Sequence, residues 1–148
     1  MHRFNQLGNP RTMEAALVWL ETAVFSKTLF RRRMSTRLMA QAYGWPSSRA
    51  ASALHLWDTI PPAYKKTGRK SIPPKGALVF WDVSSHRYGN VAISAGKGDV
   101  FTQHLNGALV VRSLSYMDSR AKRLGWTAPL FPANLARYQP SQTRRPLP

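Results

Sequence analysis

The pattern of apolar residues changes its period about halfway along the chain. In the first part, apolar side chains recur every three or four positions, which is the spacing of one helix face, as in Met13, Ala16, Leu17, Leu20 and Val24. From residue 77 onward they form short runs separated by Gly, Asn and Ser, a pattern typical of strands joined by tight turns. Helices followed by an antiparallel sheet predict an α+β domain.

The first part predicts three helices, and each has a candidate residue at its start. They are expected at 10–25 after Asn9-Pro10, at 35–43 with Ser35 as its cap, and at 48–57 with Ser48 as its cap. Gly44 is expected to end the second helix. Residues 58–76 carry four prolines and five Lys or Arg residues, which predicts a basic loop.

The second part predicts at least four antiparallel strands against which the N-terminal helices pack. The strands are expected at 77–83, 90–95, 100–105 and 108–114. Asn106-Gly107 between the last two is the strongest short signal for a hairpin. A short helix at 115–124, capped by Ser115 and stopped by Gly125, is expected before a last extended piece that begins at Trp126.

A chain of 148 residues with 43% hydrophobic residues can form one domain with a core of its own. We expect the domain at 10–132, a polar lead-in at 1–9 and a basic, proline-rich tail at 133–148. The longest apolar stretch, 15–25, is interrupted by Glu21, is too short to cross a bilayer and lacks a cleavage site. Neither a membrane span nor a signal peptide is therefore expected.

The chain contains no cysteine, which excludes disulfides, thiolate zinc sites and a cysteine nucleophile. The four histidines, at positions 2, 55, 86 and 104, do not have the spacing of metal ligands. No metal and no cofactor are expected.

Charge is the most unusual part of the composition. The chain has 22 Lys plus Arg against 6 Asp plus Glu, a net charge of +16. Such an excess predicts an anionic partner, and arginine forks bind phosphate and carboxylate best. An acidic protein surface in an assembly, DNA and a cell-wall polymer are all candidates. The residues expected to contact it are Arg31, Arg32, Arg33, Arg37, Lys65, Lys66, Arg69, Lys70, Lys75, Arg144 and Arg145.

Several segments occur in the order found in one enzyme family. They are Ser35–Gly44 (STRLMAQAYG), Pro73–Trp81 (PPKGALVFW), Gly89–Gly98 (GNVAISAGKG) and Gly125-Trp126. In this order they resemble the NlpC and CHAP families of papain-like cell-wall peptidases, especially small versions from actinobacteria and their phages. The resemblance covers about residues 10–132, and it implies a papain-like fold and a phage origin.

The residues that carry catalysis in that family differ here. The resemblance places the family's nucleophilic cysteine at Ser35, its general-base histidine at Asn90, and the orienting polar residue at Thr102 or Gln103. A serine hydroxyl is un-ionised at neutral pH, and asparagine cannot act as a general base. A helix cap explains Ser35 and a hydrogen-bonding role explains Asn90.

Two histidines remain as alternative bases for Ser35. His86 could act together with Asp82, and His104 is on the expected hairpin. In either arrangement the histidine must lie within hydrogen-bond distance of the Ser35 hydroxyl, and closeness in sequence does not ensure this.

Together, these observations predict a catalytically inactive peptidase-fold module. Its expected role is that of a structural or binding protein of a phage virion, in the capsid or tail, that contacts an acidic partner. One alternative is an endolysin-like peptidoglycan hydrolase that uses Ser35. Another is a non-specific nucleic-acid-binding protein, with aromatic residues such as Tyr88 interleaved with basic ones. The virion or the host cytoplasm is the expected location.

Overall fold

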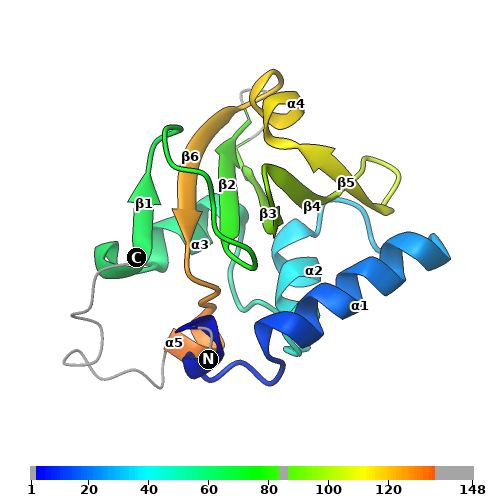
Figure 1. Cartoon of the computed structure of the whole chain (residues 1–148), viewed down its shortest axis with the longest axis horizontal. Coiled ribbons are helices and arrows are strands. Elements are labelled where there is room, and N and C mark those ends of the chain that lie inside the picture. The colour runs from blue at the N-terminus through cyan, green and yellow to red at the C-terminus, as the bar shows by residue number, and fades with distance from the viewer. Residues whose placement is uncertain (1–2, 84–86, 136–148) are drawn as a thin grey trace.

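The computed structural model describes residues 3–83 and 87–135, and it is an α+β structure as the sequence predicts (Figure 1). The described elements, in chain order, are η1 (Arg3–Gln6), α1 (Met13–Ser26), α2 (Ser35–Ala42), α3 (Ala53–Thr59), η2 (Pro62–Tyr64), β1 (Lys65–Thr67), β2 (Leu78–Asp82), β3 (Asn90–Gly96), β4 (Asp99–Gln103), β5 (Leu109–Ser113), α4 (Leu114–Asp118), β6 (Lys122–Thr127) and α5 (Pro132–Leu135).

The strands of the described chain form one antiparallel sheet in the order β1-β6-β2-β3-β4-β5. Strands β2 to β5 follow each other in space as in sequence, so the expected meander and its hairpin are confirmed. Helix α2 packs against β3 and β4, while α1 packs against α2 and β5 (Figure 1). Helix α3 packs against β2 and β3.

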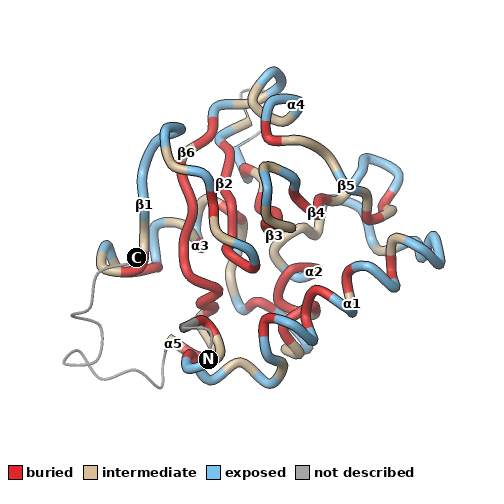
Figure 2. Tube along the Cα trace, in the orientation of Figure 1, coloured by how far each residue is buried: buried red, intermediate tan, exposed pale blue. Residues whose placement is uncertain are grey.

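The central strand β2 is buried on both faces, which explains its continuous apolar run (Figure 2). On one face, the ring of Phe80 lies 5.3 Å from that of Trp57 in α3. The other face is covered by the loop that precedes β2. Trp126 Nε1 donates a hydrogen bond to Ser71 of this loop at 3.0 Å, and Ser94 Oγ donates to the Pro73 carbonyl at 3.1 Å.

The predicted N-caps of the three N-terminal helices are wrong, although α2 begins at Ser35 as expected. Thr12, not Asn9, caps α1, and Ser52, not Ser48, caps α3. Met34 is the N-cap of α2, so Ser35 is its first helical residue and not its cap. Thr12 and Ser52 each accept a hydrogen bond from the N–H three residues later, whereas no cap side chain does so at α2. Gly44 follows the end of α2 with φ of 96°, as predicted.

Two segments adopt a different structure from the predicted one. Lys65–Thr67, expected within a loop, is the edge strand β1. The helix predicted at 115–124 is present but shorter, and its second half is wrong. Helix α4, capped by Ser113, ends at Asp118, and the chain continues as β6. Strand β6 then pairs with β1 and β2, and a side chain at Gly125 would collide with the backbone of β1.

The core reaches past both expected domain boundaries. Phe4, Leu7 and Asn134 are buried, although they lie outside residues 10–132. Asn9, the expected helix cap, joins these ends instead. Its Oδ1 accepts hydrogen bonds from Trp45 Nε1 at 2.8 Å and Asn134 Nδ2 at 3.0 Å.

Within the described residues, no helix has the length and apolar character needed to cross a membrane.

Candidate functional site

Ser35 lies in a groove of about 320 Å³ where three segments meet. We call it the Ser35 groove. It is lined by residues 33–37 at the start of α2, 47–53 before and at the start of α3, and 88–89 before β3. Three arginines contribute to its lining, namely Arg33, Arg37 and Arg49. No acidic residue is among the lining residues.

The start of α2 is held in place by the β4–β5 hairpin. Gln103, at the end of β4, accepts a hydrogen bond from the Met34 N–H at 3.1 Å and donates one to the Arg31 carbonyl at 2.8 Å. The Phe30 N–H donates to the Gly107 carbonyl at 3.0 Å. A side chain at Gly107 would collide with the Phe30 carbonyl, so only glycine permits this approach. The hairpin therefore positions the run of arginines that precedes Ser35.

The second wall of the groove is shaped by serine hydroxyls. Ser47 Oγ accepts a hydrogen bond from the Arg49 N–H, and Ser48 Oγ accepts one from the Ala50 N–H, each at 3.1 Å. The third wall, residues 88–89, is linked to the second by a hydrogen bond that the Leu54 N–H donates to the Tyr88 carbonyl at 3.1 Å. Short polar side chains thus fix the backbone from which Arg49 extends.

Arg33 and Arg49 share an unusual backbone conformation. Their φ angles are 60° and 57°, in the left-handed region that is disfavoured for residues with a Cβ. Lys27 and Lys97 are the other such non-glycine residues in the described part of the chain. Two of the four strained positions therefore line the Ser35 groove.

A second hollow shares lining residues with the groove. It has a volume of about 380 Å³ and is lined by Leu29, Phe30, Arg31, Met34, Arg37, Leu38 and Gln41. We call it the Leu29 hollow. Met34 and Arg37 line both sites. Arginines are therefore distributed over both hollows, with Arg37 between them.

The described residues that line the groove do not bring together the parts of a peptidase site. They include no histidine, aspartate or glutamate. His104 lies exposed in the β4–β5 hairpin, where its Nδ1 accepts a hydrogen bond from the Asn106 N–H at 3.3 Å. His86 lies outside the described residues. Ser35 is thus a hydroxyl without a general base among the described residues that line its groove.

Asn90 does not line the groove, although the preceding residue, Gly89, does. Asn90 Nδ2 instead donates a hydrogen bond to Thr102 Oγ1 at 3.4 Å, across the β3–β4 pair. Of the two candidates for the orienting position, Thr102 thus contacts Asn90, while Gln103 positions the start of α2. Both side chains have a structural role, and neither carries a titratable group.

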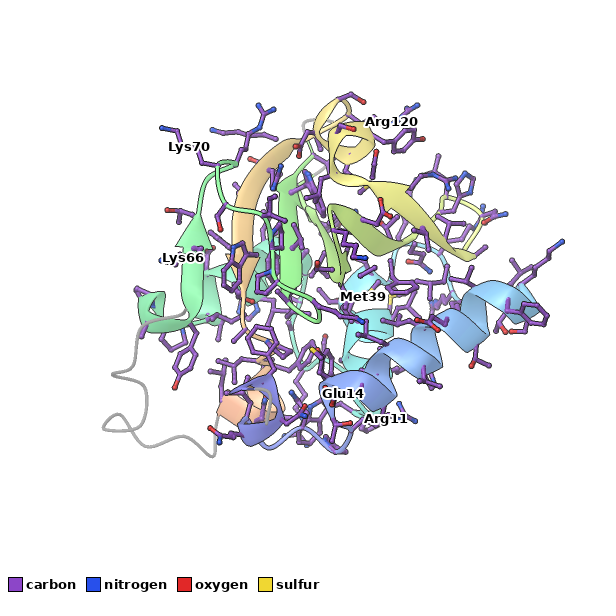
Figure 3. The ribbon with its side chains drawn as sticks, viewed as in Figure 1. Arg11, Glu14, Met39, Lys66, Lys70 and Arg120 are labelled. Atoms are coloured by element: carbon purple, nitrogen blue, oxygen red, sulfur yellow. The ribbon has the colours of Figure 1, made fainter. Side chains whose placement is uncertain are left out.

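The other predicted basic residues lie elsewhere. Lys66 and Lys70 are exposed at the β1 side of the molecule (Figure 3). Lys65 lies over the ring of Trp57 at 4.8 Å, and burial lowers its pKa although Asp58 opposes this effect. Lys75, Arg31 and Arg32 are exposed. Arg144 and Arg145 lie outside the described residues.

One arginine is fully neutralised within the fold. Arg123 and Asp118 are both largely buried, and Arg123 donates to the two carboxylate oxygens at 3.1 and 2.7 Å. Trp81 Nε1 donates to the same carboxylate at 2.9 Å, and Arg69 lies 4.0 Å away. Burial favours the neutral acid, but hydrogen bonds from Arg123 and Trp81 and the two arginine charges lower the pKa of Asp118 overall.

Arg33, Arg37 and Ser35 could be predicted as site residues from the sequence, whereas Arg49 could not. The only signal for Arg49 is its place in a serine-rich turn, and only the fold shows that this turn faces the start of α2.

No protein-family model matches the chain, and a search of curated proteins finds no similar protein either.

Proposed function

We propose that this protein is a catalytically inactive module on a papain-like fold, and that it serves as a structural or binding component of a phage particle. The observation that carries the proposal is the composition of the Ser35 groove. Ser35 and three arginines are among the residues that line it, and none of the described lining residues could remove the proton of Ser35. The arginines make it suited to binding an acidic partner.

The papain-like part of the proposal is supported by the order of the elements. A helix that begins at Ser35 packs on the strands β3 and β4, which carry Asn90 and Thr102. The hydrogen bond between Asn90 and Thr102 joins the two positions that, by the resemblance, belong to the base and its orienting residue. The phage context derives from the same resemblance to small phage versions of the family.

The absence of catalysis can be tested on purified bacterial cell walls. Wall suspensions treated with the protein are expected to keep their turbidity and to release no soluble muropeptides, while an active hydrolase of the same family serves as a positive control. Wall hydrolysis that disappears in a Ser35→Ala variant would contradict the proposal and support the endolysin-like alternative. Hydrolysis that instead disappears in His86→Ala or His104→Ala would also identify the base.

Binding to an acidic partner is tested separately, with synthetic polyanions. The protein is expected to bind at least one of poly-glutamate, a thymidine oligonucleotide and poly(glycerol phosphate) at low salt, and to bind it less as salt rises. Failure to bind any of them would remove the binding role.

A further inference from the structure

We propose that the Ser35 groove and the adjoining Leu29 hollow bind the phosphate groups of an extended anionic polymer. This inference rests on the proposed binding function and deepens it, because it names the chemical group that the arginines contact. It is carried by the arginines that line the two hollows and by the separate segments from which they come.

The carboxylate of Asp118 shows how this fold surrounds a planar anion. It accepts two hydrogen bonds from Arg123 and one from Trp81, and Arg69 lies 4.0 Å away. The Ser35 groove presents Arg33 and Arg37 from one segment and Arg49 from another, with no acidic residue among its lining residues. A carboxylate has two oxygens in one plane, whereas the three arginines line the groove from two walls.

A phosphate group fits this arrangement better. Its oxygens are tetrahedral, so they accept hydrogen bonds from several directions at once. The groove also offers hydroxyl groups, from Ser35 and Thr36 on one wall and Ser47 on the other. Donors therefore surround the groove, whereas acidic acceptors are absent from its lining.

The second hollow indicates that the ligand is extended. The Leu29 hollow adds Arg31, and Arg37 lines both sites. Volumes of about 320 and 380 Å³ side by side are more than one inorganic phosphate occupies. A polymer with a phosphate in each repeat could place successive charges in the two hollows, on either side of Arg37.

The backbone allows a sharp test. Because Arg33 and Arg49 have positive φ angles, a glycine at either position removes the guanidinium group and relieves strain at the same time. Lys97, in the β3–β4 turn, has a φ of 56° and does not line either hollow. Lys97→Gly is thus a control matched in both charge and backbone geometry.

The experiment measures binding by calorimetry at fixed low salt to three probes of equal charge: a thymidine oligonucleotide, poly(glycerol phosphate) and poly-glutamate. We expect both phosphate polymers to bind more tightly than poly-glutamate. Arg33→Gly and Arg49→Gly are each expected to weaken phosphate-polymer binding about tenfold, the loss typical of one charge-assisted hydrogen-bonding group. Lys97→Gly is expected to change binding by less than about twofold, since an exposed distant charge contributes little.

Three results would overturn the inference. Equal or tighter binding of poly-glutamate would exclude phosphate selectivity while leaving a binding function for an acidic protein surface. An effect of Lys97→Gly as large as that of Arg33→Gly would show that binding depends on overall charge and not on the hollows. If the protein binds none of the three polymers, the proposed binding function itself is wrong. A preference between the two phosphate polymers would distinguish a nucleic acid from a wall polymer as the source of the phosphate.

Discussion

Arginine has two different environments in this protein. Near α4 and β6, Arg123 is buried against Asp118, and Trp81 completes the hydrogen bonding of the carboxylate. In the Ser35 groove, Arg33, Arg37 and Arg49 are exposed and no carboxylate lines the site with them. The first arrangement stabilises the folded chain. The second leaves guanidinium groups available for a ligand.

The contrast shows that net charge alone does not identify a binding surface. With only six acidic residues, few of the 22 Lys and Arg side chains can be paired internally. What distinguishes the groove from the exposed lysines near β1 is that arginines from separate segments line one hollow. Each of the following predictions tests one side of this comparison, beginning with the largest effect.

The largest loss of stability is expected when the buried pair is broken. Asp118→Asn leaves the buried guanidinium group of Arg123 without a counter-charge, which lowers the free energy of unfolding by about 3 kcal/mol. Urea unfolding followed by tryptophan fluorescence measures it. The exposed Asp99→Asn variant is the control and should change stability by less than about 0.5 kcal/mol. Equal effects of the two substitutions would show that the Arg123–Asp118 pair has no special role.

Acid should weaken the same pair without any mutation. Because the folded-state pKa of Asp118 is lowered, its contribution to stability is present above the unfolded-state pKa of about 4 and is lost as pH falls through the folded-state value. The difference in unfolding free energy between the wild type and Asp118→Asn should therefore shrink below about pH 4. A difference that stays constant from pH 6 to pH 2 would contradict this assignment.

A smaller effect is expected at the support of the groove. Gln103→Leu removes the hydrogen bonds to Met34 and Arg31, which lowers the free energy of unfolding by about 1–2 kcal/mol. The same variant should weaken phosphate-polymer binding, because the start of α2 is no longer positioned. Thr102→Val is a useful comparison, since it removes the contact to Asn90 but leaves this support intact. If Gln103→Leu binds the polymer as tightly as the wild type, the hairpin does not position the binding residues of the groove.

The smallest effect on stability is expected at the groove itself. Arg33→Gly and Arg49→Gly should each change the free energy of unfolding by less than about 0.5 kcal/mol, because relief of the positive φ angle offsets the added flexibility of glycine. Thermal unfolding of each variant measures it. A loss comparable to that of Asp118→Asn would mean that these arginines stabilise the fold, and the contrast between the two environments would disappear.

Much of the fold could be predicted from local signals. The apolar spacing in α1, the glycine after α2 and the Asn106-Gly107 hairpin depend on neighbouring residues, and all three predictions are confirmed. Lys65–Thr67 has no apolar residue, and it becomes a strand only because β6 offers it an edge. Lys122–Leu124 could continue a helix by local preference, but pairing with β2 makes it a strand.

The sequence by itself determined the α+β class, the excess of positive charge and the absence of cysteine. These depend on composition and on short-range periodicity, which need no tertiary contact. Only the tertiary structure decided that Arg49 faces Arg33 and Arg37 across one groove, and that Gln103 holds the start of α2. The physical reason is that these contacts join residues distant in the chain, and their meeting depends on how the helices pack on the sheet.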